Sequence, residues 1–304
     1  MKKYIIYAFM AFMAASCCTN AEPGKQCDTK CEGKKKDIAL QLYSVRDDIS
    51  KDYEGTIKKV GEMGFTAVEA ANYDNGKFYG KTPEEFKADI EKNGMKVLSS
   101  HTAKQLSEAE LKSKDLSESL KWWDECIAAH KAAGMKYIVT PSMPVPATLK
   151  DLQTYCEYYN EIGKKCNENG IKYGYHNHDF EFQKIEDKMM LDYMIENTDA
   201  DKVFFEMDVY WAVIGKQSPV DYFNKYQGRF ALLHIKDNKE VGQSGMVGFD
   251  AIFKNADTAG LKHIVVEVEN CSDFTPLEGV KRSLEYLQNS CFVKESYAAC
   301  CEAK

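Results

Sequence analysis

The stretch that decides the fold is TAGLKHIVVEV, residues 258–268. Gly260 follows a helical pattern and supplies the left-handed residue that ends many helices. The apolar run after it has the length and the β-branched character of a strand buried on both faces of a parallel sheet. The stretch therefore predicts the passage from a helix into a buried parallel strand.

The same order of helix, glycine and strand recurs along the chain. It is found in EMGFTAVEA (62–70), KNGMKVLSS (92–100), AAGMKYIVT (132–140) and ENGIKYGYH (168–176). Three further strands are expected in IALQLYSV (38–45), KVFFEMD (202–208) and FALLHIKD (230–237). Eight strands that alternate with helices predict a single-domain α/β protein, a (β/α)8 TIM barrel over residues 37–290.

A helix start and a missing loop agree with this fold. Thr82, Pro83 and Glu85 have the spacing of a capping box with proline in the first helical turn. The alternative, a doubly wound open sheet, usually carries a glycine-rich nucleotide loop after its first strand. Residues 43–52, YSVRDDISKD, contain no glycine, which favours the barrel.

The N-terminus has the pattern of an export signal. Residues 1–18 combine two lysines, an apolar run too short to span a bilayer, and small residues before cysteine. The segment before Cys17 resembles a bacterial lipobox, which predicts a signal peptide over residues 1–16 and a lipid on Cys17. Cleavage before Cys18, or ordinary cleavage near Ala21 without a lipid, is the alternative.

The domain limits and the location follow from this signal. Residues 17–36 are expected to be a lipid-anchored tether and residues 291–304 a C-terminal tail. The protein would then be an exported, membrane-anchored lipoprotein that faces the periplasm or the cell surface, with the membrane contacted only through the lipid.

Composition limits the classes of partner that the protein can bind. The 304 residues carry a net charge of −7, so the chain lacks the basic surface that a nucleic-acid partner requires. Hydrophobic residues make up 44%, enough for one large core. Of the 11 cysteines, those near the termini can form disulfides in an oxidising compartment, and those on helical patterns are expected to be buried: Cys126, Cys156 and Cys166.

Ionisable residues gather at the ends of the expected strands. They are Glu69, His101, His176, His178, Glu206, Asp208, His234, Lys236, Asp237, Glu267 and Glu269. Catalytic side chains of TIM barrels project from these carboxyl ends, and unpaired charge beside a core is costly. The other two histidines, His130 and His263, are expected to serve packing or the surface.

Four consecutive strands offer a set of metal ligands: His176, Asp208, His234 and Glu267. Mixed nitrogen and oxygen ligands suit one divalent cation (Mn²⁺, Co²⁺, Zn²⁺ or Mg²⁺) with positions left for substrate oxygens. The alternative is a polar layer of salt bridges that caps the barrel.

Five segments carry a family resemblance. LQLYSVRD, HNHDFEF, FEMDVYW, LLHIKD and VVEVE, in this order, resemble the xylose isomerase-like barrel family over about residues 37–290. The family includes sugar isomerases, ketose 3-epimerases and inosose dehydratases, and more distantly endonuclease IV. The resemblance implies a divalent metal held by Glu, Asp, His and Glu, of which Asp208, His234 and Glu267 match the last three.

The first ligand position departs from the family. Members often read LALEN where this chain reads YGYHN, so His176 stands in place of a glutamate. Only Glu267 then remains of the two-glutamate proton shuttle of the ketose epimerases. A histidine can bind metal or act as a base, because its ordinary pKa of about 6.5 suits proton transfer near neutrality.

The resemblance implies a metal-dependent isomerase or epimerase that removes a proton beside the carbonyl of a sugar. Glu267, His176 and Lys236 are the expected catalytic residues. Substrate contacts are expected from Glu69, His101, His178 and Trp211, with Phe180 and Tyr210 completing an apolar wall unless they pack against loops.

A neutral sugar or a glycoside is the expected substrate. The loop NKEVGQSGMVGFD (238–250) has little positive charge for a phosphate, although backbone amides alone could bind one. The alternatives are a lyase or hydrolase of 3-keto-glycosides that uses the same enolate chemistry, and a non-catalytic sugar-binding lipoprotein. Endonuclease activity is the weakest option, and homo-oligomer formation is left open.

Overall fold

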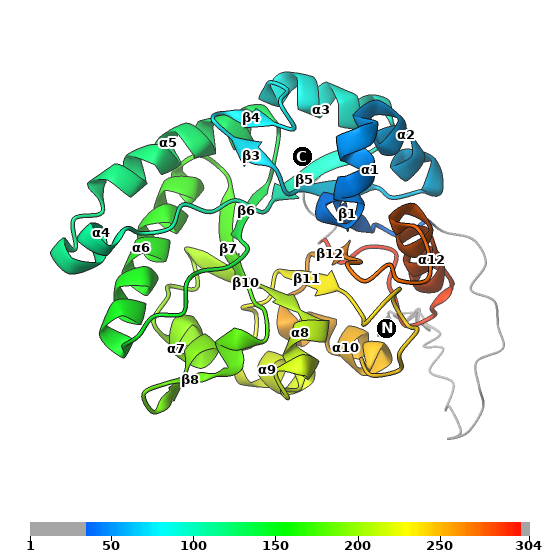
Figure 1. Cartoon of the computed structure of the whole chain (residues 1–304). Coiled ribbons are helices and arrows are strands. Elements are labelled where there is room, and N and C mark those ends of the chain that lie inside the picture. Colours follow the sequence, from blue (N-terminus) through cyan, green and yellow to red (C-terminus); the bar gives the residue numbers. More distant parts are fainter. Residues whose placement is uncertain (1–34, 299–304) are drawn as a thin grey trace, which may run out of the picture.

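Eight parallel strands form the centre of the molecule, and helices surround them (Figure 1). This computed structural model describes residues 35–298. The strands are Ala39–Gln41 (β1), Ala67–Ala70 (β2), Lys96–Ser100 (β5), Tyr137–Thr140 (β6), Lys172–His176 (β7), Val203–Asp208 (β10), Leu232–Ile235 (β11) and His263–Val266 (β12). All eight expected strands are present, and the predicted TIM barrel is confirmed.

The barrel closes between β5 and β6. The strand order is β5-β2-β1-β12-β11-β10-β7-β6, so these two strands lie at the ends of the ladder. The amide of Lys136 donates to the carbonyl of Leu98 (3.0 Å), and the amide of Thr102 donates to the carbonyl of Val139 (2.9 Å). Because the two edges are joined, the alternative of an open doubly wound sheet is excluded.

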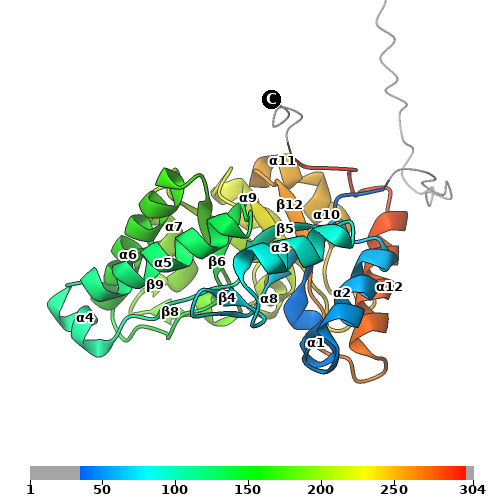
Figure 2. The same ribbon diagram turned by 90° about the horizontal axis from the view of Figure 1, so that it is seen from above.

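The helices pack on the outside of this barrel. They are Arg46–Lys51 (α1), Tyr53–Met63 (α2), Pro83–Lys92 (α3), Glu108–Ser113 (α4), Ser117–Ala132 (α5), Leu149–Glu168 (α6), Met190–Glu196 (α7), Val209–Ile214 (α8), Pro219–Lys225 (α9), Phe249–Lys254 (α10), Ala256–Ala259 (α11) and Pro276–Asn289 (α12). In both views α12 lies beside α1 and α2, so the last unit of the chain adjoins the first (Figure 1 and Figure 2).

Short elements follow the carboxyl ends of three strands. They are the 3-10 helices Leu42–Val45 (η1) and Phe180–Phe182 (η2) and two hairpins, Tyr73–Asp74 (β3) with Lys77–Phe78 (β4) and Lys184–Ile185 (β8) with Lys188–Met189 (β9). Figure 2 shows β4, β8 and α1 along the same edge of the molecule. They therefore surround the end of the barrel at which the polar residues gather.

Local signals explain where the elements begin and end. Thr82 and Glu85 form the predicted capping box at the start of α3. Gly64 has φ 109°, a conformation that favours glycine, and it ends α2. The first strand is shorter than predicted, because the side chain of Gln41 accepts a hydrogen bond from the amide of Tyr43 (3.0 Å) and the chain turns into η1.

The interior of the barrel is apolar at one end and polar at the other. The apolar floor consists of Ala39, Leu98 and Val265 together with Val139, Phe204 and Leu232. Side chains two apart on a strand share a face, so on β10 the inward positions change from Phe204 to Glu206 and Asp208. The polar residues therefore lie above the floor, at the carboxyl ends of the strands.

Gly174 makes room for this floor. It lies on β7, two residues before His176, and a Cβ atom there would come within 2.5 Å of the ring of Phe204. Only glycine leaves the space that this ring occupies. The packing of the floor thus fixes the strand that carries the first predicted ligand.

The described ends of the chain pack against the barrel. Lys36 donates its Nζ to the carbonyl of Leu287 (2.9 Å), and Val293 is buried. Lys36 and Val293 therefore contact the barrel, and the bounds of the tether and the tail stay predictions. The signal peptide, Cys17, and the parts of both segments that precede residue 35 or follow residue 298 lie outside the described residues. No helix within 35–298 combines the length and apolar character that crossing a membrane requires.

The cysteines and the two remaining histidines agree with the prediction of packing roles. Cys126, Cys156 and Cys166 are free and buried, and Cys291 is disulfide-bonded. His130 is fully buried, with its Nδ1 2.7 Å from the carbonyl of Cys126. His263 packs edge-on against Tyr137 at the floor of the barrel.

Candidate metal centre and active-site cavity

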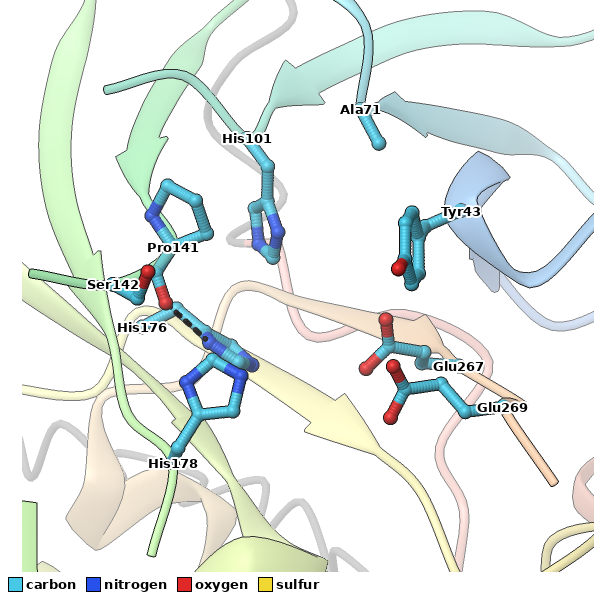
Figure 3. A pocket seen from close by; sticks show the side chains of 9 residues that line it. All are labelled: Tyr43, Ala71, His101, Pro141, Ser142, His176, His178, Glu267 and Glu269. Carbon is cyan, nitrogen blue, oxygen red and sulfur yellow. Dashed lines mark hydrogen bonds between the residues drawn. The ribbon is translucent and has the colours of Figure 1, made fainter. Parts of the chain in front are cut away.

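A cavity of about 330 Å³ opens at the carboxyl ends of the strands. Figure 3 shows the histidines on one side of it and Tyr43, Glu267 and Glu269 on the other. The lining residues are Tyr43, Ala71, His101, Pro141, Ser142, His176, His178, Glu267 and Glu269. The first two βα units and those of β5, β6, β7 and β12 all contribute.

The four predicted metal ligands lie together at the base of this cavity. One ligand atom each from His176, Asp208, His234 and Glu267 lies within 4.8 Å of all the others. All four side chains are buried. The sequence pattern therefore brings the set together as expected, since it places one inward residue near the end of each of four adjacent strands.

Two atoms of this set lack hydrogen-bond partners among the described residues: Nε2 of His176 and Oδ2 of Asp208. They lie 3.6 Å apart. Nδ1 of His176 donates to the carbonyl of Pro141 (3.2 Å), as Figure 3 shows, which leaves the lone pair on Nε2. Two buried acceptors side by side are costly unless a donor or a cation lies between them, so the residues fit a divalent metal ion.

His234 is held from both sides. Its Nδ1 lies 3.4 Å from Oε2 of Glu267, and its Nε2 lies 2.8 Å from Oε1 of Glu69. Glu69 also accepts hydrogen bonds from Gln41 (2.8 Å) and Ser99 (2.6 Å). A carboxylate behind a histidine in this way orients the ring and fixes the nitrogen that faces a metal.

A second group adjoins the first. Nε2 of His101 is 2.8 Å from Oε2 of Glu206 and 3.1 Å from Oε1 of Glu69. His101 and Glu206 form a further candidate ligand set with His176 and His234. The two sets share both of these histidines. Each set also has a further member that lines the cavity, His101 in this one and Glu267 in the predicted one, so a bound substrate can reach both.

Burial and neighbouring charges divide the site into charged and neutral groups. Burial alone would lower the pKa of His234, but Glu206, Glu267 and Glu69 raise it well above its usual value. Burial would raise the pKa of Glu267, but His234 and Lys236 hold it well below the usual range. An ionised carboxylate therefore stands at the cavity wall at neutral pH.

The other histidine and the other carboxylate of the set have pKa values shifted the opposite way. Burial, followed by the charges of His234 and His101, lowers the pKa of His176 well below its usual value. Burial raises the pKa of Asp208 to about 6, although Lys236 and His234 oppose the shift. His176 is therefore neutral and able to bind a metal at neutral pH, when Asp208 is mostly ionised.

Lys236 lies under the cavity wall rather than in its lining. Its Nζ is 3.3 Å from Oε2 of Glu267, and it forms an ion pair with Glu269. The same ammonium lies 5.1 Å from the centre of the Trp211 ring. Lys236 thus connects the two glutamates of the cavity with the aromatic residues of α8.

The expected aromatic wall stands behind His178. Phe180 stacks on the His178 ring at 5.6 Å, and Trp211 lies 5.7 Å from it. Neither residue lines the cavity, and Tyr210 does not either. The aromatic ring that does line it belongs to Tyr43, because the chain leaves β1 early and η1 presents this residue at the mouth of the barrel.

The expected substrate contacts thus separate into two groups. His101 and His178 line the cavity, whereas Glu69 is fully buried beneath it and Trp211 lies behind His178. Tyr43, Pro141 and Ser142 also line the cavity, and none of them was predicted as a site residue. All three lie within two residues of the carboxyl end of a predicted strand, so position in the repeat was the one signal that could have found them.

Comparisons with known proteins agree with this fold. The family model for the xylose isomerase-like TIM barrel matches residues 57–290. A crystal structure of a sugar phosphate isomerase/epimerase from Parabacteroides distasonis is 34% identical, with a TM-score of 0.79 over 85% of this chain and 100% of that one.

Two further proteins are more distantly similar. Inosose dehydratase from Geobacillus kaustophilus is 21% identical over 76% of each chain. The D-psicose 3-epimerase of Clostridium cellulolyticum is 16% identical, with a TM-score of 0.60 over 81% of this chain and 89% of that one. The match of the family model over most of the barrel shows that this chain belongs to the xylose isomerase-like TIM barrel family.

Proposed function

We propose that the protein is a divalent-metal-dependent isomerase or epimerase that removes a proton beside the carbonyl of a neutral sugar. The observation that carries this proposal is the pair of unpartnered acceptors, His176 Nε2 and Asp208 Oδ2, buried at the base of the cavity. His176, Asp208, His234 and Glu267 would hold the cation. When bound, a divalent cation polarises the carbonyl and acidifies the hydrogen on the neighbouring carbon.

The protein's own groups would then move the proton. Glu267 is ionised and lines one wall, so it can accept the proton from a sugar in the cavity. His176 has one lone pair and cannot both bind metal and act as a base. Return of a proton to the other face would then fall to His178 on the opposite wall, whose Nδ1 is buried without a partner among the described residues. Burial lowers the pKa of His178, so its neutral ring would first take a proton from solvent at this nitrogen and then donate it, while Glu267 releases its own proton to solvent.

Lys236 would stabilise the enolate. Its ammonium is buried beside Glu267, and neighbouring Glu267, Asp208 and Glu269 raise its pKa against the effect of burial. A fixed positive charge near the carbonyl oxygen favours the developing negative charge without reorganisation.

A neutral sugar is favoured over a sugar phosphate. The amides of Gly242 (3.1 Å) and Ser244 (3.3 Å) in the glycine-rich loop donate to Asp237, so they are not available for a phosphate. The charged residues of the cavity lining are Glu267 and Glu269, which would repel an anion.

The second candidate is elimination from a 3-keto-glycoside. It is favoured by the presence of His176 where the family has a glutamate. The two groups that face each other across the cavity are then a carboxylate, Glu267, and a histidine, His178. Such a pair suits elimination, in which one group removes the proton beside the ketone and the other, in its protonated form, protonates the departing oxygen of the aglycone. The relative from Geobacillus kaustophilus is a dehydratase, which also breaks a carbon–oxygen bond.

One experiment separates these reactions. Purified protein, with and without Mn²⁺, is incubated in D₂O with a panel of free ketoses and with 3-keto-glycosides. NMR then follows deuterium incorporation, epimer formation and aglycone release. Turnover of ketoses supports the isomerase or epimerase, and release of the aglycone supports elimination.

The control is Asp208→Asn, which keeps the shape of a ligand and removes its charge. A non-catalytic sugar-binding protein is the outcome if neither substrate class reacts, chelation leaves sugar binding intact and His234→Ala has little effect. That result would contradict both catalytic proposals.

We also infer from the lipobox-like segment before Cys17 that the protein is exported and lipid-anchored. Cells that express the full chain are labelled with a palmitate analogue, and wild type is compared with Cys17→Ala and Cys18→Ala. Label lost only in Cys17→Ala supports the anchor. Equal labelling of all three, or none, contradicts it.

A further inference from the structure

We propose that a second cavity beside the first binds the aglycone of a glycoside substrate, and that this aglycone is a hydroxyl-bearing aromatic ring. The inference rests on the glycoside-cleaving form of the proposed function and names the substrate class of that site. It is carried by the position, the walls and the polar groups of the second cavity.

The second cavity adjoins the first. It measures about 490 Å³ and lies between η1, α1, α2 and the turn at Tyr79 and Gly80 that follows the β3–β4 hairpin. Tyr43 and Ala71 line both cavities. In Figure 3 these two residues form the side of the catalytic cavity that faces away from the histidines. A ligand whose sugar lies beside Glu267 can therefore extend past Tyr43 into the second cavity.

Three tyrosines form the walls of the second cavity: Tyr43, Tyr53 and Tyr79. The rings of Tyr53 and Tyr79 lie 5.9 Å apart at an angle of 38°. Leu42 and Ile49 add apolar surface. Flat aromatic faces with aliphatic neighbours favour a ring that can stack, and such contacts add to the gain from burial alone.

Arg46 holds Tyr43 in place. Its guanidinium lies 4.0 Å from the centre of the Tyr43 ring, and its Nη1 donates to the carbonyl of Tyr43 (2.8 Å). Although Tyr43 is 41% exposed, these two contacts fix its ring between the cavities. A fixed ring at the border of the two cavities can separate a sugar subsite from an aglycone subsite.

The polar groups of this cavity suit a hydroxyl rather than a charge. The Oη of Tyr53 is buried and has no hydrogen-bond partner among the described residues. The Oη of Tyr79 accepts a hydrogen bond from the amide of Ala71 (3.0 Å). No carboxylate lines the cavity, and its one charged residue is Arg46. A phenolic hydroxyl that reaches the Oη of Tyr53 would give this buried atom a partner, whereas a second sugar would leave more hydroxyls unpaired.

The backbone is strained at this wall. Tyr79 has φ 54°, in the left-handed region that tyrosine rarely adopts, and Gly80 follows with φ 77°. The strain is held by the Tyr79–Ala71 hydrogen bond and by the bridge between Phe78 and Lys81. Such outliers are concentrated at ligand sites, which agrees with a binding role for the Tyr79 ring.

The test measures which part of a glycoside the protein contacts. Saturation-transfer NMR and titration are carried out on the purified protein with 4-hydroxyphenyl β-glucoside, phenyl β-glucoside, methyl β-glucoside, cellobiose and free 4-methoxyphenol. We expect saturation of the ring protons of every aromatic probe, including 4-methoxyphenol without a sugar. The dissociation constant of the 4-hydroxyphenyl glucoside should be about tenfold lower than that of the methyl glucoside.

Two variants locate the binding. Ser50 is exposed and lines the cavity, so Ser50→Trp should fill it and abolish the ring signals. Ser113→Trp is the matched control, because Ser113 is an exposed serine near the end of another six-residue helix, α4. Tyr53→Phe removes one hydroxyl and should abolish the preference for the 4-hydroxyphenyl over the phenyl glucoside.

Absence of ring saturation, or equal saturation in Ser50→Trp and Ser113→Trp, overturns the proposal. Tighter binding of cellobiose than of the aryl glucosides assigns the cavity to a second sugar and overturns the aromatic aglycone. Turnover is not part of this readout. Failure of the proposed reaction, which is seen as lack of product with Mn²⁺, is therefore distinguishable from failure of the aglycone site.

Discussion

The carboxylate of Glu69, on β2, lies 2.8 Å from Nε2 of His234, on β11. This contact crosses the interior of the barrel and is completely buried. Because Glu69 accepts the Nε2 hydrogen, the Nδ1 of His234 faces Glu267 and the other candidate ligands. Glu69 is thus a positioning residue for the metal centre, although the sequence alone suggested that it touches substrate.

Removal of the Glu69 charge should weaken metal binding. Glu69→Gln keeps the size of the side chain but no longer favours the Nε2 hydrogen of His234, so we expect the dissociation constant for Mn²⁺ or Co²⁺ to rise about 10- to 100-fold. Calorimetric titration measures the affinity, and the visible spectrum of bound Co²⁺ reports the geometry. The control is Glu110→Gln, which makes the same change at a buried glutamate of α4. Unchanged affinity and spectrum in Glu69→Gln would contradict the positioning role.

Replacement of His176 should change the preferred metal. His176→Glu restores the oxygen ligand of the family pattern, so binding should shift from Zn²⁺ and Co²⁺ towards Mn²⁺ and Mg²⁺. His176→Ala should lose affinity for all of them. Competition titrations with a chelating dye give the order of affinities. His263→Gln removes a histidine at the floor of the same barrel and should leave the order unchanged. The same order in His176→Glu and wild type would argue against His176 as a ligand.

Gly174→Ala should destabilise the floor of the barrel. The added methyl would come within 2.5 Å of the Phe204 ring, which packs edge-on against Tyr137. Overpacking of this kind costs about 1–3 kcal/mol in the free energy of unfolding. Urea denaturation measures the loss, and Phe204→Leu in the same chain should restore part of it. If the alanine variant is as stable as wild type, Phe204 adapts and does not constrain β7.

Glu181 should make stability fall with rising pH. It is buried, accepts hydrogen bonds from Tyr175 (2.6 Å) and the amide of His178 (2.8 Å), and burial raises its pKa to about 7. The folded state therefore holds this proton more tightly than the unfolded state. Its contribution is fully present below about pH 4.5 and is lost as the pH rises through about 7, a change of about 3 kcal/mol.

The measurement is the free energy of unfolding in urea at several pH values between 4.5 and 8. Glu181→Gln cannot titrate, so its stability should change less across this range than that of wild type. Parallel pH profiles for the two proteins would show that Glu181 has an ordinary pKa.

Much of the site could be predicted because its pattern is local. In a strand buried on both faces, apolar residues dominate until the carboxyl end, where Asp208, His234 and Glu267 interrupt them. The glycine after each helix marks where the next strand begins. Residue order alone therefore determined the eight strands, the barrel and the four residues that come together at its base.

Only the tertiary structure decided the depth of each side chain and its partners. Glu69 and His101 both end strands, yet Glu69 is sealed beneath the cavity and His101 lines it. Glu206 pairs with His101, more than a hundred positions away in the sequence. Tyr43 reaches the cavity because Gln41 ends β1 early. The physical reason is that closure of the barrel fixes how far each strand extends past its neighbours, and this stagger depends on long-range pairing that no local pattern encodes.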